Sequence, residues 1–175
     1  SNLERAREAL NTLSHRGPDQ WNEYFDHKIY LGHRRLSILD LSIQGMHPMS
    51  TDDKSVFITV NGEIYNFKEL RRELETKYQF KSTSDSEVIL HGYKEWGIDI
   101  LLDKIDGMYA FSIYDKTKEK LYLARDRVGI KPLYYSTFQD QITFASELKA
   151  IQRYYNSQSL KKDYTALYDF LTYRY

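Results

Sequence analysis

The spacing of apolar side chains predicts helices in both halves of the chain. The first helix carries its apolar stripe at Leu3, Ala6, Leu10 and Leu13. Ser1 and Glu4 have the spacing of a capping box at its start, and Gly17-Pro18 should end it. Further helices, two of them with the same cap spacing, are predicted over 66–78 (Asn66 and Glu69), 84–96 (Ser84 and Glu87, closed by Gly97), 98–105 and 163–173.

Short runs of β-branched and aromatic residues predict strands. They lie at 28–33, 56–60, 108–114, 120–125, 133–136 and 141–145. The last four runs are separated by turn-prone residues and are typical of an antiparallel meander. Because helices and strands first alternate and then segregate, the pattern indicates an α+β fold in which helices cover sheet layers.

Composition and charge narrow the class of protein. The chain has 175 residues, enough for one domain of ordinary size. Lysine plus arginine and aspartate plus glutamate number 25 each, so no basic excess points to nucleic acid or to an anionic membrane. There is no cysteine, which excludes disulfides and thiol catalysis within these residues. The five histidines have no metal-binding spacing, so we expect no metal site.

Three polar clusters lie at predicted strand or helix ends, where side chains can converge on a pocket. The first runs from His33 to Asp40 and places arginine just past a strand. A guanidinium binds a carboxylate through two parallel hydrogen bonds, a geometry that lysine cannot match. The alternative for this cluster is a surface arginine in a salt bridge.

The second cluster is Asn61-Gly62-Glu63-Ile64-Tyr65-Asn66, directly after the strand predicted at 56–60. A side-chain amide beside a glycine backbone N–H supplies two fixed donors for a developing oxyanion. Asn-Gly after a strand is also the commonest signal of a two-residue hairpin. Against the hairpin, the chain soon enters a predicted helix and no second strand follows.

The third cluster, Ser82 to Glu87, lies at a helix start, where Asp85 either meets an ammonium group or merely complements the helix dipole. A carboxylate-binding arginine, an ammonium partner and an oxyanion pair together suit a free α-amino acid whose side-chain carbonyl is attacked. Glutamine fits that description. The residues alone do not show that the three clusters converge.

Seven motifs stand in order between about His15 and Ile151. They are HRGPD at 15–19, RLSILD at 35–40, NGEIYN at 61–66, SDSE at 84–87, DGMYAF at 106–111, RDRVGIKPLYY at 125–135 and ASELKA at 145–150. In this order they resemble the glutaminase domain of glutamine-hydrolysing asparagine synthetases, which are class II glutamine amidotransferases.

This resemblance implies an N-terminal-nucleophile hydrolase-like fold, a four-layer αββα sandwich with two antiparallel sheets. In that family an N-terminal cysteine attacks the glutamine amide, its own α-amino group acts as base, and glutamate and ammonia are released. The ammonia passes to a C-terminal synthetase domain of the same chain, which uses ATP and magnesium to activate aspartate. The glutaminase domain needs no cofactor. A cytoplasmic location and a homodimer are further expectations.

The resemblance also implies roles for residues of the three clusters. Arg35 would hold the α-carboxylate of glutamine, and Asp85, assisted by Glu63, would hold its α-amino group. Asn61 and Gly62 would form the oxyanion hole. The pocket would be lined by Leu36, Ser37, Ile38 and Leu39.

The missing cysteine is the one departure from the family. The capping box places Ser1 at a helix start, whereas the family's nucleophile lies on a strand before that helix. We therefore expect residues 1–175 to be a single glutaminase domain truncated at both ends, without its first strand and its synthetase domain, and inactive alone. The alternatives are a glutamine-binding regulatory module that lost its nucleophile, an amidotransferase of a related cell-surface sugar pathway, or an interaction domain.

Overall fold

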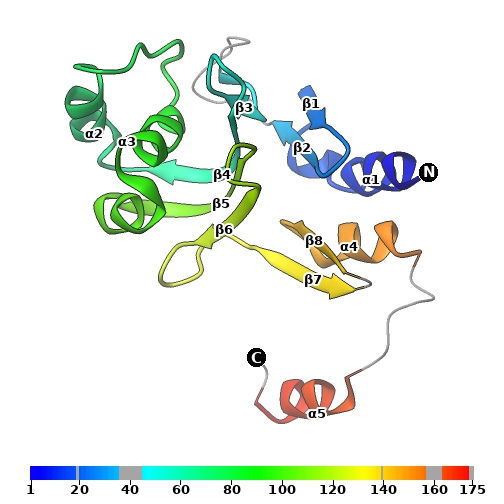
Figure 1. The fold of residues 1–175 in the computed structure, drawn as a ribbon. Helices are drawn as coiled ribbons and strands as arrows, with labels where there is room; N and C mark the ends of the chain where they lie inside the picture. The colour runs from blue at the N-terminus through cyan, green and yellow to red at the C-terminus, as the bar shows by residue number, and fades with distance from the viewer. Residues whose placement is uncertain (19, 36–44, 139, 157–162, 174–175) are drawn as a thin grey trace.

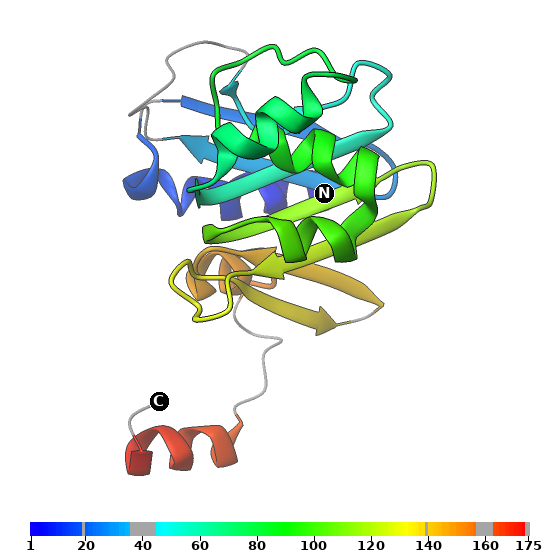
Figure 2. The same ribbon diagram turned by 90° about the vertical axis from the view of Figure 1, so that its left-hand side faces the viewer.

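The computed structural model describes residues 1–18, 20–35, 45–138, 140–156 and 163–173. Helices α1 (Asn2–Asn11) and α4 (Leu148–Tyr154) form one outer layer, and α2 (Phe67–Leu74) and α3 (Glu87–Lys104) form the other. Two layers of antiparallel strands lie between them (Figures 1 and 2). The expected four-layer α+β arrangement is thus present.

The central sheet has four antiparallel strands in the order β3 (Met49–Ser50), β4 (Val56–Ile64), β5 (Gly107–Asp115) and β6 (Lys120–Arg125). Side chains alternate between its two faces, as the strand period requires. Ile58 and Val60 belong to the core that α2 and α3 cover, whereas Phe57 packs with Leu31 and Tyr114 on the opposite face. Both faces of β4 are therefore buried.

The second strand layer consists of two separate hairpins. One pairs β1 (Gln20–Phe25) with β2 (Tyr30–Arg35), and the other pairs β7 (Tyr134–Phe138) with β8 (Gln141–Ala145). A 3-10 turn at Ser14–Arg16 leads into β1. Helix α5 (Tyr164–Tyr173) lies apart from the layers, and none of its residues is buried (Figure 1).

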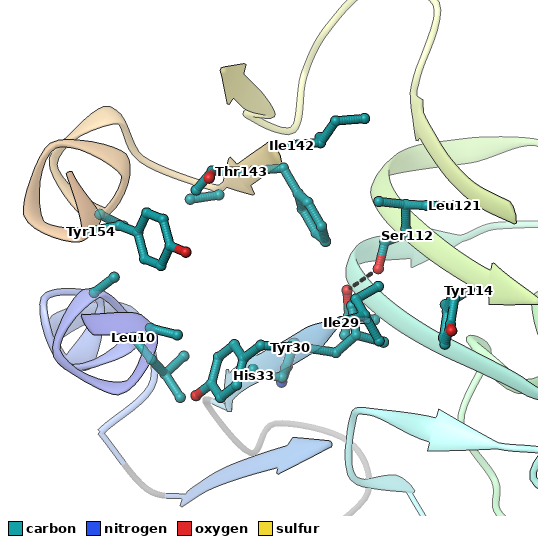
Figure 3. A pocket seen from close by; sticks show the side chains of 18 of the residues that line it. Leu10, Ile29, Tyr30, His33, Ser112, Tyr114, Leu121, Ile142, Thr143 and Tyr154 are labelled. Carbon is teal, nitrogen blue, oxygen red and sulfur yellow. Dashed lines mark hydrogen bonds between the residues drawn. The ribbon is translucent and has the colours of Figure 1, made fainter. Parts of the chain in front are cut away.

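A trough of about 650 Å³ separates the two hairpins. Its walls are β2 and β8, and α1 and α4 close its outer side (Figure 3). Thr59, Asn61 and Ser112 of the central sheet line its inner side. Among the described strands, β2 pairs only with β1 and β8 only with β7, so each has an edge without a strand partner. A sheet edge of this kind presents unpaired N–H and C=O groups.

Several local predictions are confirmed. Ser1 caps α1, since its Oγ accepts a hydrogen bond from the Glu4 N–H at 3.3 Å and its amino group donates one to the Glu4 carboxylate at 2.6 Å. Gly97 interrupts α3 with a φ of 79°, which separates the two predicted helices at the expected position. Left-handed backbone of this kind favours glycine.

The cap predictions at the other two helices were wrong. Asn66 makes no side-chain cap; its amide instead donates to Lys104 O at 2.8 Å and accepts from the Asp106 N–H at 3.0 Å. Helix α3 begins at Glu87, not at 84, and Glu87 accepts bonds from Ser82 Oγ and two backbone N–H groups. Asn66 thus binds tertiary partners in place of a cap, and Glu87 binds the loop that precedes its helix.

Strand pairing also differs from the sequence prediction. β1 and β3 were not predicted. The Asn61-Gly62 motif lies within β4 and not after it, because its residues pair with Met108 to Ala110 on β5. The predicted meander is divided, since β5 and β6 join the central sheet while β7 and β8 form their own hairpin. Within the described ranges, no helix is long and apolar enough to cross a membrane.

Candidate functional site

The end of β4 approaches β5 so closely that only glycine fits at position 62. A Cβ on Gly62 would lie 2.1 Å from Met108 O and 2.6 Å from Tyr109 Cα. Gly62 is nevertheless exposed on its other side, which leaves room for a ligand next to its backbone. This contact also explains the motif at 106–111, because the backbone of residues 108 and 109 packs against the predicted oxyanion pair.

Asn61 lines the trough and carries an unsatisfied donor. Its Nδ2 is buried and has no hydrogen-bond partner in the described part of the structure. A buried polar group without a partner is destabilising by about 1–3 kcal/mol and is rare in native proteins. An amide held in this state is suited to donate to a group that enters the trough.

Asp85 is tied directly to the same strand end. Its Oδ2 accepts a hydrogen bond from the Ile64 N–H at 2.6 Å. Burial raises the pKa of Asp85, repulsion from Glu63 adds to this, and bonds from the Ile64 and Ser86 N–H groups act in the opposite direction. Two neighbouring carboxylates, one of them desolvated, form a site that a bound ammonium group would stabilise.

Arg35 ends β2 on the neighbouring hairpin. Residues 33 and 35 share one face of that strand, and His33 Nε2 donates to Val60 O at 3.0 Å, one residue before Asn61. Burial lowers the pKa of His33 to about 4 and that of His47 to about 3, and the Arg35 charge contributes to both shifts. Arg35 therefore belongs, with His33, to the face of β2 that is turned towards β4.

Sequence reasoning missed the residues that position Arg35. A Cβ on Gly17 would lie 2.5 Å from the Arg35 nitrogen, so the HRGPD turn packs directly against the Arg35 backbone. His33 and His47 pack with ring centroids 5.0 Å apart beside it. The HRGPD motif could have predicted the contact between Gly17 and Arg35. A single histidine on a strand, in contrast, gives no indication that it packs against a second histidine.

Two other motifs meet at an ion cluster. Glu147 accepts from His15 at 2.8 Å and from Arg16 at 3.2 Å, and Lys149 lies 3.0 Å away. Burial acts to raise the pKa of Glu147, but these hydrogen bonds outweigh it and lower the pKa to about 2. The cluster joins the turn at 14–16 to the start of α4, which makes it a structural support.

The predicted site residues are thus only partly brought together. Asn61, Gly62, Glu63 and Asp85 meet at one strand end, and Arg35 ends β2 in the other strand layer. Of these five, only Asn61 lines the trough shown in Figure 3. Leu36, Ser37, Ile38 and Leu39 lie outside the described residues. Nothing in the described ranges groups three or more metal-binding side chains.

Comparison with known proteins adds independent findings. Residues 1–175 match the family model described as glutamine amidotransferase domain. Asparagine synthetase [glutamine-hydrolyzing] 2 of Bacillus subtilis is 48% identical over 141 residues, which cover 81% of this chain and 18% of that protein. Asparagine synthetase [glutamine-hydrolyzing] 1 of the same organism is 43% identical over 164 residues, covering 93% and 25%. The chain therefore spans a quarter or less of these relatives.

A solved structure supports the fold alone. Glutamine phosphoribosylpyrophosphate amidotransferase from Bacillus subtilis, complexed with ADP and GMP, superposes with a TM-score of 0.68 at 22% identity. The match covers 83% of this chain and 39% of that one.

Proposed function

Because the chain belongs to the glutamine amidotransferase domain family, we propose that it is the glutaminase half of a glutamine-hydrolysing asparagine synthetase. The observation that carries this proposal is the buried, unpartnered Asn61 amide beside Gly62, on a trough bordered by two unpaired strand edges. The site is suited to receive a developing oxyanion.

The trough is the place that we propose for the nucleophile. An upstream strand lying between β2 and β8 would satisfy both edges and complete one continuous sheet, and its cysteine would lie beside Asn61. Asn2 and Leu3, at the start of α1, line the same trough. This arrangement accounts for the split second layer and for the lack of cysteine in residues 1–175.

The chemistry then follows from the groups around β4. The cysteine sulfur attacks the side-chain carbonyl carbon of glutamine, and the α-amino group of that cysteine takes the thiol proton. Asn61 Nδ2 and the Gly62 N–H donate to the oxygen as it becomes negative. The same amino group returns the proton as ammonia leaves, and water hydrolyses the thioester to glutamate and free thiol.

Charged side chains are proposed to orient glutamine by binding the two charged groups on its α-carbon. Arg35 holds the α-carboxylate with two parallel hydrogen bonds. Asp85, with Glu63 beside it, holds the α-ammonium group. Leu36, Ser37, Ile38 and Leu39 are proposed to line the remaining wall. Glutamine is thereby fixed at both ends of its α-carbon while its amide reaches Asn61.

The partner of this half is the synthetase domain of the longer chain. ATP and magnesium are proposed to be used in that domain, as the resemblance to the asparagine synthetases implies. Aspartate is proposed as the ammonia acceptor from the names of the relatives. A cytoplasmic location fits this biosynthetic reaction, and a homodimer remains a prediction.

The test compares residues 1–175 with the natural protein that includes its upstream segment. We expect residues 1–175 to bind glutamate without hydrolysing glutamine, and the extended protein to release ammonia. Arg35→Lys in the extended protein should raise the KM for glutamine about tenfold with a smaller effect on kcat, because the two-pronged contact is lost. An extended protein that has an N-terminal cysteine and no glutaminase activity would exclude the proposal in favour of a regulatory module.

A further inference from the structure

One buried carboxylate holds the loop that carries Asp85. Residues 75–86 connect α2 to α3 (Figure 1), and Glu87, the first residue of α3, is only 3% exposed. Its Oε1 accepts a hydrogen bond from the Lys81 N–H at 2.8 Å, and its Oε2 accepts from the Ser82 N–H at 2.9 Å and from Ser82 Oγ at 2.6 Å. Because a buried carboxylate is costly unless its oxygens are bonded, these contacts fix the loop against the start of α3.

Helix α2 holds the same loop from its other side. Arg71 Nη1 donates to Ser82 O at 2.9 Å, and the central carbon of its guanidinium lies 4.4 Å from the centre of the Phe80 ring. Ser82 is therefore bonded through its N–H, its hydroxyl and its carbonyl, to both neighbouring helices. A polar group whose hydrogen bonds are all satisfied in a buried network has little freedom to move, so the position of Ser82 is fixed.

The imidazole of His91 orients the Glu87 carboxylate. His91 Nε2 lies 3.3 Å from Glu87 Oε1, and the ring packs against Tyr78 and Phe80 with centroids 5.0 Å and 4.7 Å apart. Since an ionised carboxylate only accepts hydrogen bonds, the contact requires the proton on Nε2. Nδ1 is then a buried acceptor without a partner in the part of the chain that the structure describes. The ring is thus held by packing and by Glu87 alone.

Serine hydroxyls connect Ser82 to the turn that presents Asp85. Ser82 Oγ accepts from the Ser84 N–H at 3.2 Å, and Ser84 Oγ accepts from the Ser86 N–H at 3.3 Å. Asp85 lies between these two serines, and its Oδ2 accepts from the Ile64 N–H at 2.6 Å. The turn is therefore attached to Ser82 on one side and to the end of β4 on the other.

We propose that the side chains of Ser82, Glu87 and His91 are positioning residues for glutamine recognition. They act through Asp85, by setting where its carboxylate meets the α-ammonium group. The inference rests on the proposed function, in which Asp85 binds that group. Glu87 does not bind glutamine itself, because it is buried and both of its oxygens are bonded within the protein. A shift of about 1 Å in a group that orients substrate can cost about a hundredfold in rate.

Selectivity for the α-ammonium group measures this positioning in the extended protein. Glutaramate is glutamine with a hydrogen in place of that group, so the ratio of the two kcat/KM values isolates the contact. We expect the wild type to prefer glutamine by roughly 30-fold, because a charge-assisted hydrogen bond is lost with the analogue. In Glu87→Gln, an amide NH2 replaces one accepting oxygen and faces a donor. The preference should then fall to roughly threefold, through a higher KM for glutamine and little change in kcat.

Ser82→Ala is the milder second variant, because it removes one hydroxyl and leaves the backbone contacts in place. Its preference should fall in the same direction as that of Glu87→Gln. In Asp85→Asn the preference should already be lost, and adding Glu87→Gln should reduce it no further, because residues that act through one group are not additive.

Asp115 supplies a matched control for loss of stability. It is also buried and also holds a turn, since it accepts from the Lys118 N–H at 2.9 Å and from Tyr93 Oη at 2.8 Å. It lies at the other end of β5, opposite Val56 at the start of β4. Asp115→Asn should therefore lower the Tm and leave the preference for glutamine over glutaramate unchanged.

The outcomes separate this inference from the proposed function. Wild-type preference in both Glu87→Gln and Ser82→Ala, or an equal loss in Asp115→Asn, would overturn the inference, while glutamine hydrolysis would still support the glutaminase. If the extended protein hydrolyses no glutamine, the glutaminase proposal is lost, and the Kd of glutamate against that of glutarate gives the same ratio. A preference for glutamate that falls in Glu87→Gln and not in Asp115→Asn would retain the positioning role, and any other pattern would exclude it.

Discussion

At the scale of single residues, the site depends on donors and charges that the free protein leaves incompletely paired. Asn61 has a buried amide nitrogen without a partner, and Asp85 has a pKa raised mainly by burial. Each arrangement is unfavourable without a ligand, and in the proposed site glutamine would relieve it, through its carbonyl oxygen in one case and its ammonium group in the other. Substrate binding and folding stability are therefore in opposition at both positions.

Asn61→Ala tests this opposition in the extended protein. We expect kcat to fall about a hundredfold or more, because one oxyanion donor is worth roughly 3 kcal/mol in the transition state. The free energy of unfolding should rise by about 1–3 kcal/mol, since the lost N–H group was buried without a partner. Kinetics and urea unfolding measure the two effects. A large loss of stability with unchanged kcat would show that Asn61 is structural.

The raised pKa of Asp85 leads us to expect that the binding of glutamate and glutamine depends on pH. Only the ionised carboxylate attracts the ammonium group, so affinity should be full above the raised pKa of Asp85 and should weaken as the pH falls through it. Calorimetric titration from pH 8 to pH 4 measures this. In Asp85→Asn, affinity should be low throughout and this pH dependence should disappear. If the wild-type profile persists in that variant, another group is responsible.

At the scale of elements, helix starts are determined by tertiary contacts as much as by local caps. Asn66 occupies a cap position, yet its amide bridges the end of α3 and the start of β5. Glu87 stands where a capping carboxylate was predicted, yet it is buried and binds the preceding loop. Burial would raise the pKa of Glu87, but hydrogen bonds from His91, Ser82 and Lys81 lower it to about 2.

Substitutions at Asn66 test whether its side chain acts as a bridge between α3 and β5 or as a helix cap. Asn66→Ala should lower the free energy of unfolding by about 2 kcal/mol, because two tertiary hydrogen bonds are lost. Asn66→Asp keeps full capping ability but cannot donate to Lys104 O, so it should be similarly destabilising. Thermal unfolding of both variants measures the effect. Wild-type stability in Asn66→Asp would mean that capping is the main role.

At the scale of the whole molecule, the trough divides a layer that a continuous sheet would otherwise fill. The described chain has a complete central sheet and two hairpins with facing unpaired edges. α1 and α4 already contact each other across the outer side. The layers are thus assembled around an open space, and the proposal places the nucleophile segment in it.

Adding the natural upstream segment should therefore stabilise the protein as well as activate it. We expect the Tm to rise by about 5–10 °C, since a few kcal/mol shift a chain of this size by that amount. Amide exchange at Gly32 and Ile142, whose N–H groups point away from their hairpin partners towards the trough, should slow in parallel. The control is a segment of equal length with prolines at alternate positions, which cannot pair. Equal Tm values for the two extensions would contradict this placement.

The sequence by itself determined most elements of the protein and the identity of its motifs. Helical spacing, the Ser1 cap, the break at Gly97 and the strands at 120–125 and 141–145 are local properties, fixed by side-chain period and backbone preference within a few residues. Only the tertiary structure decided how strands pair, why Gly62 must be glycine and which donor is left unsatisfied. Those features depend on backbones that are distant in sequence, such as Asn61 opposite Ala110 and Gly17 against Arg35, and no local pattern encodes their approach.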